Sequence, residues 1–389
     1  MSRILPPEAP VRRMAQPPLP PTSQAIGLAR LICILGIVYV HAWTGVGGDV
    51  MAAQAGSAQD VLRWTVVELF GRSAVPLLSI VSGWLVAASL AKRGPRGFVA
   101  GKVRSVLLPM LLWNAIAIVA VTGAGVMGMP NVPLLGGFDW IADNLFNLNR
   151  AGDINVQTAF LRDLFLCMLA APMLVRLRTP WLVALIAAAA VWAVGGWMLY
   201  LLLRPSILLF FAAGLLLRRH ALAERIGLLP FWLTVLPFGI VLPFKIGLSI
   251  LGEGGVGQPA GLVNGVDLLL RGSAALLVWR SAMAMARGGV GARLLAFERY
   301  AFFLFCSHLL FMWLVAPLIG GLSGAMGSPY WPLFFLAQPL FALGFAIMLA
   351  QGIEALSPAA AALLSGGRLG KAQTASPAAL PLAHAHWKL

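Results

Sequence analysis

Charged residues are scarce in this chain of 389 residues. Asp, Glu, Lys and Arg together make up 11% of it, whereas hydrophobic residues make up 60%. A typical soluble domain is about 25% charged, so this composition excludes an ordinary soluble enzyme and indicates a polytopic membrane protein. Only three cysteines are present, all in apolar segments and without the spacing of a disulfide framework or a metal site. We therefore expect small core cysteines and no metal cofactor.

Acidic residues are rarer than basic ones, 13 against 28, which gives a net charge of +15. A positive charge of this size can indicate nucleic acid, but we find no soluble basic domain and no nucleic-acid-binding motif. The Lys and Arg residues instead fall between apolar segments, as in cytoplasmic loops of membrane proteins. We therefore expect membrane lipids, and no nucleic acid, among the partners.

Ten apolar segments are expected to cross the membrane as helices, which predicts an all-α fold. They lie near residues 26–43, 65–90, 105–127, 158–176, 181–196, 198–217, 228–250, 262–285, 300–320 and 331–353. If both termini are cytoplasmic, 21 of the 28 Lys and Arg residues lie on the inner side, while 9 of the 13 Asp and Glu residues lie elsewhere. This positive-inside bias favours about ten transmembrane helices with cytoplasmic N and C termini.

The chain divides into three predicted parts. Residues 1–25 are rich in proline and arginine and predict a disordered cytoplasmic tail. Residues 26–353 form the ten-helix membrane domain. Residues 354–389 are small, polar and proline-containing, and predict a second disordered cytoplasmic tail. The N-terminal residues lack the order of a signal peptide, so we expect the first apolar segment to be retained.

The first apolar segment carries an ionisable residue at each end. It reads RLICILGIVYVH from Arg30 to His41. In a helix these two residues lie roughly 16 Å apart along the axis, so if Arg30 is at one membrane surface, His41 lies beyond the middle of the ~30 Å hydrocarbon layer. A neutral imidazole there could remove a proton from a hydroxyl group. The alternatives are a structural histidine and an arginine that only anchors the helix.

Three further residues in apolar segments are candidates. Arg72 stands four residues after Glu68, which predicts a helical ion pair. Ser82 lies among small residues that favour close helix packing, an explanation that we prefer to direct catalysis. His308 is near the middle of the ninth segment and is the second candidate for handling a proton. Asp267 and Arg271 have the spacing of another ion pair.

A predicted inner loop, residues 92–104, concentrates positive charge. Its cations are Lys92, Arg93, Arg96, Lys102 and Arg104. Such a group could hold the phosphates of a cytosolic nucleotide-like molecule, although the chain has no phosphate-binding glycine loop. Attraction to the membrane surface explains the same cluster.

The longest predicted outer loop, residues 128–157, combines Trp140 with acidic residues and asparagines. Its acidic and basic residues are Asp139, Asp143, Arg150 and Asp153. An aromatic ring beside polar groups could bind carbohydrate by stacking and hydrogen bonding. An interfacial connector anchored by Trp140 accounts for the composition equally well.

Four motifs in a fixed order resemble the membrane acyltransferase-3 family. They are the R-x10-H spacing in the first segment, RSAVPLLSIVSGWL in the second, KVRSVLLPMLLW leading into the third, and SHLLFMWLV near the end. Members of that family transfer acyl groups to envelope glycans and have ten membrane spans. The resemblance covers most of residues 24–350. It implies catalytic roles for Arg30, His41, Arg72, Ser82 and His308, and donor-binding roles for Arg93, Lys102 and Arg104.

The resemblance also implies a reaction. Acyl-CoA, most simply acetyl-CoA, would approach from the cytoplasm with its phosphates on the inner cations, and His41 would act as general base on a sugar hydroxyl of an exopolysaccharide or a lipid-linked glycan. The protein would then be a multi-pass enzyme of the bacterial inner membrane. Two alternatives remain from the residues themselves: an exporter of glycans or lipid intermediates without acyl chemistry, and a structural subunit of an envelope assembly.

Overall fold

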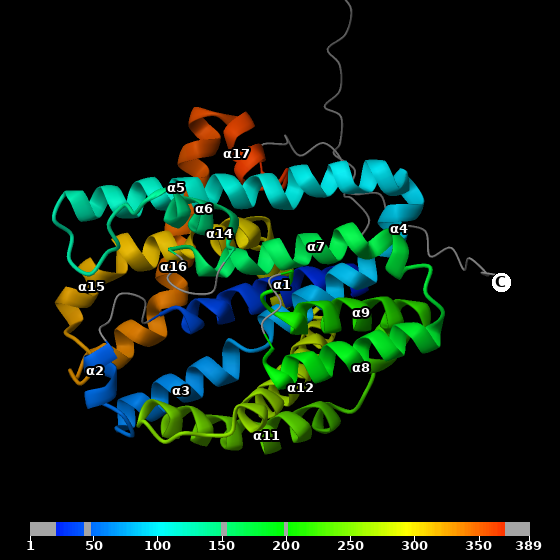
Figure 1. The fold of residues 1–389 in the computed structure, drawn as a ribbon, viewed down its shortest axis with the longest axis horizontal. Helices are drawn as coiled ribbons and strands as arrows, with labels where there is room; N and C mark the ends of the chain where they lie inside the picture. Colours follow the sequence, from blue (N-terminus) through cyan, green and yellow to red (C-terminus); the bar gives the residue numbers. More distant parts are fainter. Residues whose placement is uncertain (1–20, 43–47, 149–153, 198–200, 370–389) are drawn as a thin grey trace, which may run out of the picture.

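The computed structural model describes residues 21–42, 48–148, 154–197 and 201–369, in which nearly all regular structure is helical (Figure 1). Residues 1–20 of the expected N-terminal tail (1–25) and the end of the chain from residue 370 lie outside the described residues. Residues 21–25 already belong to the first helix, so the tail prediction is wrong there. Eleven long helices form the bundle: α1 (Pro21–Val40), α3 (Ala58–Phe70), α4 (Ala74–Lys102), α5 (Leu108–Val126), α7 (Ala159–Leu174), α8 (Thr179–Gly195), α9 (Pro205–Arg219), α11 (Phe231–Glu253), α12 (Ala260–Met285), α14 (Glu298–Leu314) and α16 (Trp331–Leu356).

Shorter elements connect the long helices. They are α2 (Gly48–Ala53), the π-helical turn Val103–Leu107, α6 (Phe138–Phe146), the 3-10 turn Val156–Thr158, α10 (Leu222–Ile226), α13 (Gly289–Leu295), α15 (Ala316–Ser323) and α17 (Pro358–Leu364). The predicted all-α fold is therefore confirmed for the described part of the chain.

The described residues contain six helical stretches that are long and apolar enough to cross a membrane. A seventh is added if α13 and α14, which are bent by 52° relative to each other, count as one broken span. One of the six stretches runs over residues 58–126 and includes α3, α4 and α5. These lengths make the chain a multi-pass membrane protein, whereas ten spans and cytoplasmic termini remain predictions.

Helix α1 occupies the middle of the bundle, where it packs against α3, α4, α12, α14 and α16 (Figure 1). Its apolar side chains are almost all buried within the main core, as for Leu28, Ile34 and Val38. Burial on all sides explains why the helix is apolar all round. Arg30 therefore lies within this central helix, and His41 directly follows it.

The second predicted segment, 65–90, is wrong in one respect, because the chain breaks at residues 71–73 between α3 and α4. The break lies directly against α1: a Cβ atom on Gly36 would stand 2.1 Å from the carbonyl oxygen of Phe70. Such close backbone contact is open only to glycine. Arg72 therefore lies in a turn beside α1 and not inside a continuous helix.

The predicted inner loop 92–104 is also mostly helical, since α4 continues to Lys102. A kink at Gly94, whose φ is +65°, and the following Pro95 turn the last part of the helix. The ninth segment, 300–320, breaks in a similar way at Val315 between α14 and α15. Local turn residues within apolar runs explain these differences.

The prediction of a disordered tail over residues 354–389 is wrong for residues 354–369. Helix α16 continues to Leu356, and α17 follows with Ser357 as its N-cap. Ala361 and Leu364 of α17 are buried, and the Trp113 indole N–H donates a hydrogen bond to the Leu364 carbonyl (3.0 Å). Contacts with α5, and not composition, order this segment.

Candidate functional site

Two histidines from distant parts of the sequence meet at the end of α1. His41 directly follows α1, where its backbone N–H donates to the Val38 carbonyl (3.1 Å). The centre of its imidazole ring lies 5.4 Å from that of His308 on α14. His41 is partly buried and His308 is fully buried. The structure therefore brings together the two histidines that the sequence singled out separately.

Hydrogen bonds fix the proton position on His308. Its Nδ1 lies 2.8 Å from the Phe305 carbonyl oxygen and 3.2 Å from that of Leu304. Because carbonyl oxygens only accept hydrogen bonds, Nδ1 carries the proton in the neutral ring. The Nε2 atom then keeps a lone pair, and it has no hydrogen-bond partner among the described residues. A buried acceptor without a partner is costly, which makes this nitrogen a candidate for contact with a substrate or with His41.

Arg72 belongs to a network of charges next to this histidine pair. Its guanidinium binds both oxygens of Glu68 at 2.5 Å and lies 3.9 Å from Asp267. Asp267 also pairs with Arg271 (2.5 Å) and lies 3.9 Å from Lys245. The predicted ion pairs Glu68–Arg72 and Asp267–Arg271 are therefore both confirmed. No sequence pattern indicates that the two pairs meet.

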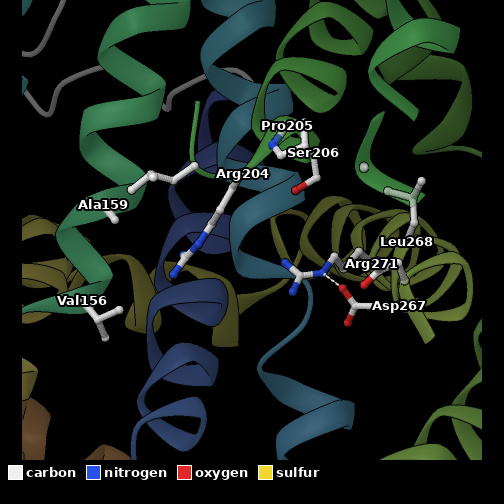
Figure 2. Close-up of a pocket in the computed structure, with 11 residues that line it drawn as sticks. Val156, Ala159, Arg204, Pro205, Ser206, Asp267, Leu268 and Arg271 are labelled. Atoms are coloured by element: carbon white, nitrogen blue, oxygen red, sulfur yellow. Dashed lines mark hydrogen bonds and ion pairs between the residues drawn. The ribbon is translucent and has the colours of Figure 1, made fainter. Parts of the chain in front are cut away.

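A polar pocket with a volume of about 330 Å³ adjoins this network (Figure 2). Figure 2 shows the Arg204 and Arg271 side chains extending into it from different helices, with Asp267 bonded to Arg271. Ser206 and Asn264 add neutral polar groups to the lining. Arg204 and Arg72 are the cations whose charge acts on His41. The pocket shares Asp267 with the charge network that contains Arg72.

Buried Asp163 holds Arg204 in this position. Its carboxylate accepts hydrogen bonds from the backbone N–H groups of Arg204 (2.8 Å) and Leu203 (3.3 Å), and it pairs with Arg162 (2.7 Å). A carboxylate that binds the first residues of a helix satisfies amide groups that otherwise lack partners. Asp163 thus fixes the start of α9 and with it the wall of the pocket.

Several cations lie around Arg30, the candidate site residue within α1. Arg30 pairs with Glu298 at the start of α14 (3.4 Å). The charges of Arg93 and Arg30 act on Lys102, whose ammonium lies 5.4 Å from the centre of the Phe98 ring. The Arg93 side chain extends past the kink toward Gly101: its Nη1 atom lies 2.8 Å from where a Cβ on Gly101 would stand. The structure thus brings two of the three predicted donor-binding cations, Arg93 and Lys102, together with Arg30.

Arg104 is not brought into this group. It lies exposed on the π-helical turn after α4, and its side chain makes no ion pair or hydrogen bond with any described residue. Ser82 also differs from a catalytic hydroxyl, because its Oγ donates its proton to the Leu78 carbonyl one turn earlier (2.7 Å). Next to it, a Cβ on Gly83 would stand 2.0 Å from the Phe211 carbonyl oxygen. This region of α4 therefore serves close packing against α9.

Three asparagines of the predicted outer loop, Asn144, Asn147 and Asn155, are buried. Asn155 and Thr158 both bind the Asn114 side chain (2.9 and 2.7 Å), and the Asn144 side chain accepts a bond from the backbone of Ile154 (2.8 Å). A buried network of this kind stabilises a connector. Arg150 and Asp153 lie outside the described residues.

Metal-binding geometry does not occur in the described part of the chain, where no three His, Cys, Asp or Glu residues are placed to share an ion. The three cysteines are free and buried. The ionisable groups described at the site are imidazole, guanidinium and carboxylate groups.

A family model described as an acyltransferase domain matches residues 23–350. The chain belongs to the acyltransferase-3 family. This acyltransferase is also similar to the succinoglycan biosynthesis protein ExoH of Rhizobium meliloti (strain 1021), with 28% identity over 385 aligned residues that cover 91% of this chain and 95% of the relative. No solved structure matches it. The residues that the family model matches include Arg30, His41 and His308.

Sequence reasoning about the acyltransferase missed the pocket residues Arg204, Asn264 and Ser206 as members of the site. For Arg204 there was a signal, namely a charge within an apolar run. Asn264 and Ser206 carried none, because single polar residues are common in membrane helices. Only the packing of α9 and α12 against the same two helices, α4 and α8, brings them together.

Proposed function

We propose that the protein is an O-acyltransferase that moves an acyl group from cytosolic acyl-CoA to a hydroxyl group of an exopolysaccharide or of its lipid-linked precursor. The observation that carries this proposal is the pair of sites along α1, with His41 and His308 at one end and the cations around Arg30 toward the other. The family membership and the polysaccharide role in the relative's name support the acyl group and the acceptor class.

The expected topology gives the two substrates separate approaches. With ten spans and cytoplasmic termini in the inner membrane, the Arg30 end faces the cytoplasm and the His41 end lies toward the outer side. The phosphates of CoA would bind Arg30, Arg93 and Lys102 through charge-assisted hydrogen bonds. The pantetheine arm would extend along α1 over the roughly 16 Å that separate Arg30 from His41. The thioester would then lie beside His41.

In the reaction, His41 removes the proton from the attacking sugar hydroxyl. The hydroxyl oxygen forms a bond with the thioester carbonyl carbon, the carbon–sulfur bond then breaks, and the departing thiolate takes the proton back from the imidazolium. Arg72 and Arg204 provide positive charge beside the developing oxyanion. We assign His308 a positioning role: its Nε2 lone pair accepts a hydrogen bond from His41 as that ring becomes positively charged.

The acceptor sugar would occupy the pocket between α9 and α12. Asn264, Ser206 and the guanidinium of Arg271 line it, and groups of this type bind sugar hydroxyls. A volume of about 330 Å³ lies within the usual range for small-ligand pockets. The pocket therefore suits one or two sugar residues better than a long polymer segment.

Purified protein in detergent tests this proposal with radiolabelled acetyl-CoA and extracted polysaccharide. Label that enters an alkali-labile ester on the polysaccharide supports the transferase. If label is transferred from another acyl-CoA and not from acetyl-CoA, that other acyl-CoA is the donor. If no acyl-CoA is consumed, while vesicles that contain the protein move a lipid-linked glycan, the protein is an exporter and the proposal is wrong.

A further inference from the structure

The folded segment after α16 ends beside the cations that we assign to the donor. Ala361, Leu364 and Leu369 of this segment are buried, the last with 1% of its surface exposed. The hydrogen bond from Trp113 to the Leu364 carbonyl ties the segment to α5. In Figure 1, α17 lies on the outside of α5. The chain after α17 is thus held in a defined place.

A glycine turn brings this chain against the π-helical turn that follows Lys102. Gly366 has a φ of +62° and Gly367 a φ of +84°, which side-chain-bearing residues rarely adopt. A Cβ on Gly366 would stand 2.5 Å from the carbonyl oxygen of Ser105. Only glycine permits this approach. The turn formed by Gly366 and Gly367 places the residue that follows it, Arg368, near the inner cations.

Arg368 is then placed by contacts from α14 and from its own turn. Its guanidinium lies 4.0 Å from the centre of the Phe302 ring, and its Nη1 donates to the Ser365 carbonyl (2.8 Å). Phe302 is one helical turn beyond Glu298, the residue that pairs with Arg30. Arg30 and Arg368 therefore lie over neighbouring turns of the same helix.

The charge around Arg368 is not balanced. Arg368 makes no ion pair with any acidic residue in the described ranges, and its side chain remains accessible to solvent. Partial removal from water and repulsion by Arg30 lower the pKa of its guanidinium to about 10. Arg368 also acts most strongly of all cations on Lys102, ahead of Arg93 and Arg30. Cations that repel one another at an accessible site are stabilised by a bound anion.

We propose that Arg368 is a phosphate-binding residue of the acyl donor site, acting together with Arg30 and Lys102. This inference rests on the proposed function, since the anion it names is a phosphate of CoA. Arg368 uses its planar fork on the phosphate, while the Phe302 ring supports the other face of the guanidinium. The C-terminal segment is then part of the enzyme's binding site.

Calorimetric titration of the detergent-purified full chain with CoA tests the inference. Arg368→Gln is expected to raise the Kd for CoA about tenfold, because a charge-assisted hydrogen bond to phosphate is lost. Arg368→Lys keeps the charge without the fork and should give a smaller rise. Arg225→Gln removes an exposed cation on α10, outside the basic stretch 92–104, and should leave the Kd unchanged. Lys102→Gln serves as the positive control.

The outcomes separate the inference from the proposed function. If Arg368→Gln binds CoA as the wild type does while Lys102→Gln binds it more weakly, the inference is wrong and the donor site stands. An equal loss in Arg225→Gln and Arg368→Gln also overturns it, because the effect is then general. Failure of the wild type to bind CoA contradicts the donor itself. Should Arg368→Gln not fold, a wild-type Kd for Arg368→Lys overturns the inference.

Discussion

His41 and His308 lie with their ring centres 5.4 Å apart, although they are on helices from opposite ends of the sequence. The His308 proton is committed to the Phe305 carbonyl, so that the ring offers a lone pair near His41. In the reaction that we propose, His41 takes the proton and His308 orients the His41 ring.

Two substitutions of His308 separate its two nitrogens. In His308→Asn the side-chain amide can still donate near the Nδ1 position, but the Nε2 acceptor is gone. In His308→Gln a polar atom can reach the Nε2 position. We expect acyl transfer to fall about 10- to 100-fold in His308→Asn because His41 is no longer oriented, and to fall less in His308→Gln. The rate is measured at saturating donor over a range of pH. Equal rates in both variants and the wild type contradict the positioning role.

Glu68 neutralises Arg72 inside the bundle. The Glu68 carboxylate is fully buried and holds the guanidinium at 2.5 Å through two bonds. Glu68→Gln leaves a buried cation with one fewer partner and is expected to destabilise the protein by about 3 kcal/mol. The double variant Glu68→Gln, Arg72→Gln should recover part of this loss. Unfolding temperatures in detergent measure both effects. A double variant that is less stable than the single one shows that the pair is not the cause.

Gly83 permits the contact between α4 and α9. Because a Cβ would stand 2.0 Å from the Phe211 carbonyl oxygen, Gly83→Ala is expected to force the two helices apart and to destabilise the protein by about 3 kcal/mol. Gly123→Ala on α5 is the matched control, since no heavy atom lies within 4 Å of its Cβ position. It should leave stability unchanged or raise it by up to about 1 kcal/mol. Similar unfolding temperatures for the two variants contradict the packing explanation.

Trp113 fastens the C-terminal segment. Trp113→Phe keeps an aromatic ring against Phe303, which it contacts edge-on with ring centres 4.9 Å apart, but it loses the N–H bond to Leu364. A loss of about 1 kcal/mol should loosen residues 357–369 locally. Hydrogen exchange measured by mass spectrometry is expected to be faster in that segment and unchanged in α1. Unchanged exchange over residues 357–369 indicates that other contacts hold it.

The sequence was sufficient for the features that depend on local pattern. Long apolar runs placed most of the long helices, and a spacing of four residues predicted both the Glu68–Arg72 and the Asp267–Arg271 pairs. It was insufficient where tertiary contacts decide. The break around Arg72 depends on backbone packing against Gly36, and the order of α17 depends on Trp113, which is far away in sequence.

The grouping of site residues shows the same limit. The hydrophobic pattern marked His41, His308 and Arg204 as unusual, but no periodicity relates residues on three different helices. Arg368 had no signal at all, because it stands in a stretch whose composition resembles a disordered tail. Its position follows only from the folded path of residues 357–369.

The central claim is that His41 is the base of an acyl transfer to polysaccharide. The most direct test deletes the gene and restores it as wild type, His41→Ala or His220→Ala, at equal membrane levels; His220 is an exposed histidine outside the site. Ester-linked acyl groups on the extracted polysaccharide are then measured by mass spectrometry. Wild type and His220→Ala should restore one acyl mass, and His41→Ala should reduce it about 10²- to 10⁴-fold. Full acylation with His41→Ala, or loss of surface polymer without any change in acylation, contradicts the claim.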